Sequence, residues 1–169
     1  MKSKGWVITV GIFALIVVVG MVLAYPLLKT QKTLKIYQPA DINPKLVDES
    51  KRSVEKDHRI ADFQLVNQLG DTITNKAFKD KIYVADFFFA TCPSICPIMS
   101  SNIADLQEEF KDRPEVMFLS HSVTPQIDSV EALYEYGELY EANPERWMLT
   151  TGDKKHIYEL ARKSYFAVL

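Results

Sequence analysis

The sequence predicts an α/β domain with a mostly parallel sheet. From residue 82 onwards, short apolar runs rich in β-branched and aromatic residues alternate with segments whose apolar residues recur at helical spacing. This strand–helix order is typical of domains in which helices cover a parallel sheet. The chain has 169 residues, 47% of them hydrophobic, which suffices for one globular domain with an appendage.

An apolar segment near the N-terminus is long enough to cross a membrane as a helix. Residues 5–28 include no charged side chain, and Trp6 and Tyr25 bracket the apolar run as an aromatic belt does. A span needs ~20 apolar residues, whereas the apolar part of a cleaved signal peptide, which is the alternative, has ~7–15. We therefore predict that residues 1–28 form an N-terminal transmembrane helix. Lysines flank both ends, so their count leaves the orientation open.

The segment after the anchor differs in composition from both of its neighbours. Residues 29–56 are charged, contain Pro39 and Pro44 and show little sustained period. We expect them to be a tether that holds the domain away from the membrane. The domain itself is expected at residues 57–169.

The domain is expected to open with a hairpin. Apolar residues within 60–66 predict a short strand, the polar residues around Gly70 predict a turn, and residues 72–74 can return as the partner strand. The next apolar run, residues 82–89, has the composition and length of a buried strand.

The later segments alternate between apolar residues at helical spacing and short apolar runs typical of strands. In chain order we expect a helix at 100–110, a strand at 115–123, a helix at 129–141, a strand at 147–151, a helix at 154–163 and a strand at 164–169. The helices show apolar residues three and four positions apart, and Asp128 or Ser129 can cap the second of them. The strands are short apolar runs that end at turn residues.

Both cysteines lie in the turn between the central strand and the following helix. A helix N-terminus favours the thiolate over the thiol, so Cys92 and Cys96 are expected to be reactive. The Cys-x-x-x-Cys spacing predicts both sulfurs on one face of a first helical turn. Such a pair can bind one soft metal ion such as Cu(I), or close into a small disulfide loop. Two buried, inert cysteines are the alternative.

Other polar residues are weaker candidates. His121 lies near the end of the strand beside the cysteine strand and could point towards the cysteines, but single histidines such as His58, His121 and His156 are more often surface or core residues, so none is assigned as a ligand. Asp86 lies inside an apolar strand, which predicts a buried carboxylate with a raised pKa or a hydrogen-bonded structural one. The net charge of −2 and the lack of a basic stripe argue against nucleic-acid binding.

Four motifs together resemble the Sco/SenC family over residues 58–169. They are Asp62-Phe-x-Leu-x-Asn-Gln-x-Gly70, Val84-x-Asp-Phe-Phe-Phe followed by Thr91-Cys-Pro-Ser-Ile-Cys-Pro97, Ser122-Val-x-Pro125 with Asp128, and Trp147-x-Leu-Thr-Thr-Gly152-Asp153. The resemblance implies a membrane-anchored, thioredoxin-like domain that binds a copper ion through the two cysteines and a distant histidine. It also implies a role in delivering copper to the binuclear centre of cytochrome c oxidase, as a metallochaperone or as a thiol reductant.

The sequence departs from the family pattern at two places. Thr124 stands where many relatives have an aspartate. The chain ends at Leu169, whereas relatives continue with a histidine-bearing loop, so the C-terminal part of the fold and the third ligand are expected to be missing. Only Cys92 and Cys96 are carried over as metal ligands.

These observations lead to three hypotheses. The first is a copper metallochaperone rather than an enzyme, with the copper-bearing subunit of cytochrome c oxidase as its partner. The second is a membrane-tethered thiol–disulfide oxidoreductase with Cys92 and Cys96 as the redox-active pair, acting on an oxidase or another exported protein. The third is a truncated product that has lost high-affinity copper binding. The first two imply a single-pass membrane protein whose domain lies on the extracytoplasmic (periplasmic) side.

Overall fold

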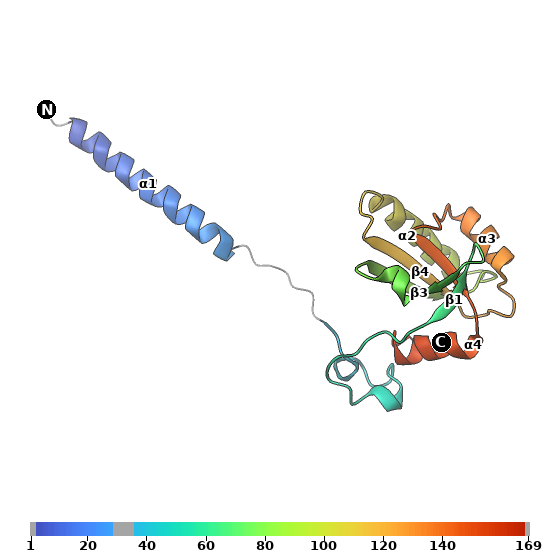
Figure 1. Cartoon of the computed structure of the whole chain (residues 1–169). Coiled ribbons are helices and arrows are strands. Elements are labelled where there is room, and N and C mark those ends of the chain that lie inside the picture. Colours follow the sequence, from blue (N-terminus) through green and yellow to red (C-terminus); the bar gives the residue numbers. More distant parts are fainter. Residues whose placement is uncertain (1–2, 29–35, 168–169) are drawn as a thin grey trace. The chain divides into compact units, whose positions relative to one another are not determined.

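The computed structural model describes residues 3–28 and 36–167, coloured along the chain in Figure 1. The chain divides into two compact units, Met1–Ile36 and Tyr37–Leu169. The first unit contains helix α1, Ser3–Leu28. Within it, Gly5–Tyr25 is long and apolar enough to cross a membrane, and its apolar side chains are exposed all round, which is typical of a helix that does not pack against a soluble core.

The second unit is built on a five-stranded mixed sheet with the strand order β2-β1-β5-β4-β3. Its strands are β1 (Gln64–Asn67), β2 (Thr72–Thr74), β3 (Ile82–Phe88), β4 (Val116–Ser122) and β5 (Trp147–Thr151). The last three are mutually parallel, whereas β1 is antiparallel to both β2 and β5. The predicted hairpin and the mostly parallel sheet are confirmed.

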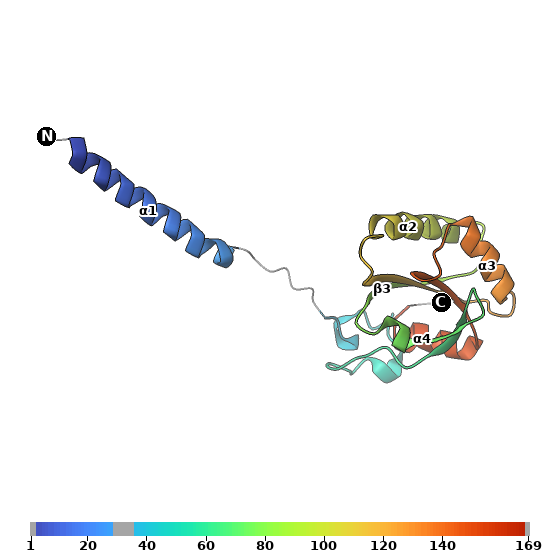
Figure 2. The same cartoon turned by 45° about the horizontal axis from the view of Figure 1, so that its top comes forward.

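Helices cover both faces of this sheet. Helices α2 (Ile95–Glu109) and α3 (Val130–Leu139) lie on one side and α4 (Lys154–Lys163) on the other, as Figure 2 shows. Three short 3-10 turns complete the unit: η1 (Pro39–Asp41), η2 (Glu49–Lys51) and η3 (Asn75–Phe78). Because β4 lies between two strands and under helices on both faces, all seven of its residues are buried, as expected for a central parallel strand.

Two apolar clusters fill the space on either side of the sheet. The cluster under α2 and α3 includes Phe88, Phe118, Trp147 and Leu133, together with both cysteines. The cluster under α4 includes Phe63, Leu65, Met117, Leu119, Ile157 and Leu160. Successive strand residues alternate between the two clusters, as the pleat requires.

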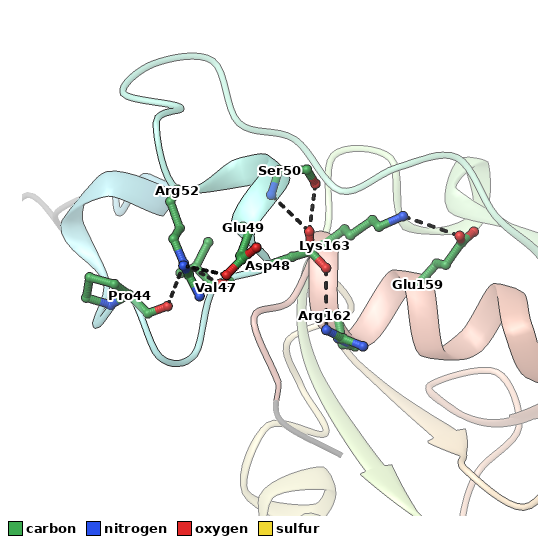
Figure 3. A network of polar contacts seen from close by, with 9 residues as sticks. All are labelled: Pro44, Val47, Asp48, Glu49, Ser50, Arg52, Glu159, Arg162 and Lys163. Atoms are coloured by element: carbon green, nitrogen blue, oxygen red, sulfur yellow. Dashed lines mark hydrogen bonds and ion pairs between the residues drawn. The ribbon is translucent and has the colours of Figure 1, made fainter.

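The segment at residues 37–56 folds onto the domain instead of extending as a tether. Val47 is only 2% exposed, and the backbone N–H of His58 donates to the Gln38 side chain at 3.0 Å. Figure 3 shows the polar contacts of this segment, among them an ion pair between Asp48 and Arg162 of α4 at 3.6 Å. Buried apolar residues spaced among charges give no periodic signal, which explains why the sequence suggested a tether. Residues 29–35 of the predicted tether lie outside the described residues.

The expected strand at the C-terminal end is absent from residues 164–167, so that prediction was wrong. The chain instead turns back onto α4: the Ser164 N–H donates to the Leu160 carbonyl at 2.9 Å, and the Ala167 N–H donates to the Ala161 carbonyl at 2.8 Å. Phe166 has a left-handed backbone with φ of 57°, which a strand does not allow. Residues 168–169 of that prediction lie outside the described part.

Strand β3 forms one end of the sheet. Among the described residues it pairs only with β4. Ile82 is 67% and Val84 42% exposed, although the strand reads as a buried one. The strand that the sequence predicts to be central is therefore an edge strand. Its C-terminal end leads directly into the cysteine turn.

Candidate metal centre

The cysteine turn joins the end of β3 to the start of α2. Within this turn, the Cys92 N–H donates a hydrogen bond to the Phe89 carbonyl at 3.1 Å. Helix α2 begins at Ile95. Cys96 is therefore its second residue, and Cys92 lies three residues before its start. Pro97 is tolerated at the third position because the first N–H groups of a helix have no partner within the helix. The helix thus starts five residues before the predicted one.

The sulfur of Cys92 is surrounded by donors. The backbone N–H groups of Ser94 and Cys96 and then the Cys96 thiol lower the pKa of Cys92 to about 7. The Ser94 hydroxyl lies 3.9 Å from the same sulfur. These groups stabilise the thiolate as a helix N-terminus does. Cys92 itself is buried, with 8% of its surface exposed.

Cys96 has the opposite character. It is only 3% exposed and packs in the cluster under α2 and α3. Burial raises the pKa of this thiol, and the neighbouring Cys92 adds to the effect. The two cysteines are therefore both buried and lie side by side, with a lowered pKa at Cys92 and a raised pKa at Cys96, a division that the spacing alone did not predict.

Asp86 is a carboxylate on the same face of the sheet as the cysteines. The Ser120 hydroxyl donates to it, and the Trp147 indole N–H donates to that hydroxyl at 2.9 Å. Burial raises the pKa of Asp86 to about 6, although the hydrogen bond from Ser120 acts in the other direction. The expected raised pKa and the expected hydrogen-bonded carboxylate are both present.

A second carboxylate, Asp128, lies where β4 ends. It is fully buried and accepts hydrogen bonds from Ser122, Thr124 and the backbone N–H of Ala90. The sequence pattern indicates Asp128 only as a possible helix cap and as part of a motif. The side chain that caps α3 is Ser129, whose hydroxyl accepts from the Ala132 N–H at 3.2 Å.

The histidines lie away from the cysteines. His121 is buried on the α4 side of the sheet, with its Nδ1 3.2 Å from the Thr150 hydroxyl, so the idea that it points towards the cysteines was wrong. In the parallel register His121 is opposite Phe87, whereas Phe88, which faces the cysteines, is opposite Ser122. His58 contacts the Ser164 carbonyl at 2.9 Å, and His156 belongs to α4.

The donor set at this site consists of two sulfurs. In the part of the chain that the structure describes, no group of three or more His, Cys, Asp or Glu side chains is arranged to hold a metal ion. Two thiolates suit a soft ion of low coordination number, and they leave room for a ligand from elsewhere. The same pair could also be oxidised to a disulfide.

Comparison with known proteins gives consistent matches. A family model described as SCO1/SenC matches residues 51–169. The SCO1 protein homolog of Bacillus subtilis (strain 168) is 31% identical over 114 residues, which are 66% of this chain and 59% of that protein. This chain therefore spans about three fifths of the length of that relative.

Solved structures match the same part of the chain. One is BsSco, a member of the Sco family of cytochrome c oxidase assembly proteins in which a disulfide switch was identified; it has a TM-score of 0.61 and 31% identity, with 66% of this chain and 67% of that chain covered. Another is Bradyrhizobium japonicum ScoI with copper bound, with a TM-score of 0.55, 25% identity and coverage of 61% and 64%.

Proposed function

This chain belongs to the SCO1/SenC family, and on that premise we propose that it binds a copper ion through Cys92 and Cys96 and serves the assembly of the copper centre of cytochrome c oxidase. Its fold is thioredoxin-like, as in the solved Sco structures. The observation that carries the proposal is the pair of adjacent sulfurs at a helix N-terminus, one of them stabilised as a thiolate. The copper-bound relative supports the choice of metal.

Copper would be held by soft, anionic sulfur. Cys92 supplies a thiolate near neutral pH, and Cys96 becomes a second one when a cation offsets the cost of its burial. A bound copper ion would be the cargo that the partner subunit accepts. Two sulfur ligands leave a coordination position open for a ligand from that partner. The copper-bearing oxidase subunit is the partner that this proposal names.

A direct test is a titration of the reduced full chain in detergent with Cu(I) against a chromophoric chelator. We expect roughly one copper ion per chain, and we expect Cys92→Ser and Cys96→Ser each to abolish binding. His58→Gln is the matched control, because it removes a soft nitrogen on the other side of the sheet and should leave binding intact. Stoichiometric copper in the double cysteine variant would contradict the proposal.

A second candidate function is thiol–disulfide exchange. The asymmetry of the pair favours it, because the thiol with the lowered pKa suits attack on a disulfide and its neighbour suits resolution of the mixed disulfide. The Cys92 thiolate would attack a substrate disulfide and release one substrate thiolate; Cys96 would then attack the mixed disulfide, release the second and leave a Cys92–Cys96 disulfide. Turnover of a disulfide substrate with a dithiol reductant, measured without copper, separates this function from metal delivery.

The proposal includes membrane anchoring. Residues 1–28 would hold the chain in the bilayer, and the domain would lie on the extracytoplasmic side. The apolar helix α1 supports the anchor. The side can be tested by adding protease to intact spheroplasts, where cleavage of the domain is expected and full protection would contradict this orientation.

A further inference from the structure

One buried carboxylate ties the end of β4 to the cysteine turn. Asp128 has no exposed surface. Its Oδ2 accepts hydrogen bonds from the Ser122 hydroxyl, from the Thr124 hydroxyl at 2.9 Å and from the Ala90 N–H at 3.3 Å. The first two donors are the last residue of β4 and a residue just after it, and the third lies two residues before Cys92. This single oxygen thus joins two segments that are more than thirty residues apart in the sequence.

Three donors from two segments converge on one carboxylate oxygen of Asp128, and a carboxylate oxygen can accept more than one hydrogen bond. Helix α3 begins two residues later, at Val130. The other oxygen, Oδ1, is buried and has no hydrogen-bond partner among the described residues. Among the described residues, all hydrogen bonds of the Asp128 carboxylate are therefore made by Oδ2, the oxygen that accepts from the Ala90 N–H.

The residue at position 124 fits this role. The Thr124 hydroxyl donates to Asp128, and its backbone N–H donates to the Ser122 hydroxyl at 3.1 Å. An apolar side chain at position 124 could not donate to the carboxylate. Threonine therefore completes the set of donors.

We propose that Asp128 is a positioning residue that fixes the direction in which the chain leaves β3, and thereby holds the Cys92 sulfur against the N–H groups of Ser94 and Cys96. The path is short: Asp128 holds Ala90, and the next bond along the chain is that of the Cys92 N–H to the Phe89 carbonyl. This inference rests on the proposed function, in which the cysteine pair is the functional site. It adds a residue on which the redox and metal-binding properties of that pair depend.

The test is the reduction potential of the Cys92–Cys96 pair in Asp128→Asn. The full chain in detergent is equilibrated with reduced and oxidised glutathione; the pair loses two protons and two electrons, and oxidised glutathione takes them up to give two thiols. Asparagine keeps the shape, but its amide oxygen is a weaker acceptor for these three donors than a carboxylate oxygen, so the hydrogen bond to the Ala90 N–H weakens. The Cys92 thiolate then loses its donors, and we expect the equilibrium to shift up to about tenfold towards the disulfide, which is about 30 mV.

Asp153→Asn is the matched control. Asp153 caps α4 and accepts from the His156 N–H at 2.8 Å, so the same substitution weakens a helix start on the opposite face of the sheet. We expect this variant to lower the unfolding temperature and to leave the potential unchanged. If Asp128→Asn behaves in the same way, Asp128 only supports the fold and the proposal is wrong.

A second variant covers the case in which Asp128→Asn does not fold. Thr124→Val removes one donor to the carboxylate at nearly constant volume, and we expect a smaller shift in the same direction; an unchanged potential would again overturn the proposal. The measurement uses no copper. A wild-type chain that fails to bind copper would contradict the proposed function, and the effect of Asp128 on the thiols would still be measured.

Discussion

His121 of β4 lies beside Phe87 of β3, with 5.1 Å between the centroids of their stacked rings. Phe63 meets the same imidazole edge-on at 6.3 Å. The histidine is thus part of the apolar cluster between the sheet and α4, whereas Phe88, one residue after Phe87, packs with Cys92 and Cys96 on the other face. Phe87 and Phe88 are consecutive residues of β3 that face opposite sides of the sheet, so the buried imidazole and the two thiols lie on opposite faces.

The first prediction concerns acid stability. Burial, and secondarily His156, lowers the pKa of His121 to about 3. The imidazole therefore stays neutral in the folded chain while the unfolded chain binds a proton below about pH 6.5, so folding stability is lost as the pH falls from 6.5 towards 3. His121→Phe removes this loss. We expect the free energy of unfolding of the variant to fall by about 2 kcal/mol less than that of the wild type between pH 8 and pH 5.

Denaturant titrations at the two pH values measure this difference. His58→Gln serves as the control, because it changes a histidine outside the apolar cluster. The same pH dependence in wild type and His121→Phe would show that the imidazole is protonated in the folded chain. Copper binding by His121→Phe should equal that of the wild type, because the ring is on the other face from the sulfurs.

The second prediction concerns Asp86 and has the opposite sign. Burial raises the pKa of its carboxyl from an ordinary value of 3.8 to about 6. The stability that this group contributes is complete below pH 3.8 and is lost as the pH rises through 6, where the folded chain must hold a buried charge. Asp86→Asn should therefore be more stable than the wild type at pH 7.5, by about 2 kcal/mol, and similar to it at pH 4.

Thermal or denaturant unfolding at both pH values checks this result. Asp105→Asn, at an exposed carboxylate of α2, is the control and should change little at either pH. A variant that is less stable than the wild type at pH 7.5 would mean that the charged carboxylate and its bond from Ser120 stabilise the fold.

The third prediction is that the two cysteines react at different rates. Cys92 is the more exposed one and has a pKa of about 7, whereas burial raises the pKa of Cys96. Iodoacetamide should therefore modify Cys92 first, with a rate that rises through a midpoint near pH 7. Peptide mass spectrometry of the reduced chain identifies the modified residue.

Single variants supply the comparison for this prediction. Cys96→Ser keeps a hydroxyl that can donate to the Cys92 sulfur, so fast labelling should persist. In Cys92→Ser only slow labelling should remain. Equal rates at the two positions would contradict the prediction, because they would mean that both thiols are labelled only after the cysteine turn opens.

Local patterns in the sequence were sufficient for much of the fold. The hairpin, the alternation of strands and helices and the bounds of α4 follow from apolar period and turn residues, which act within a few positions. The start of α2 was missed because Pro93 and Pro97 suggested a turn, although a proline in the first helical turn removes no hydrogen bond. The packing of residues 37–56 depends on contacts with α4, which no local pattern reports.

The placement of the two cysteines between a strand and a helix could be predicted from the sequence, but the geometry around them could not. The two cysteines and the strand end that carries them can be read from the sequence. The side of the sheet that His121 faces depends on its register with Phe87, and a shift by one residue would have reversed it. The contact between Asp128 and Ala90 joins two loops through tertiary structure, so spacing could not reveal it.

The last prediction concerns α1. A charge at the centre of a membrane-spanning helix opposes insertion by about 2.5 to 3.5 kcal/mol, so the double variant Leu15→Lys and Ile16→Lys should release the chain from membranes that retain the wild type after carbonate extraction. Leu139→Lys is the control: Leu139 is an apolar residue of α3 that is 71% exposed, and the variant should stay in the membrane fraction. Mass spectrometry of the wild-type chain isolated from membranes distinguishes a membrane anchor from a cleaved signal peptide. A mass that includes residues 5–25 indicates an anchor, whereas loss of these residues would show that the segment is a signal peptide.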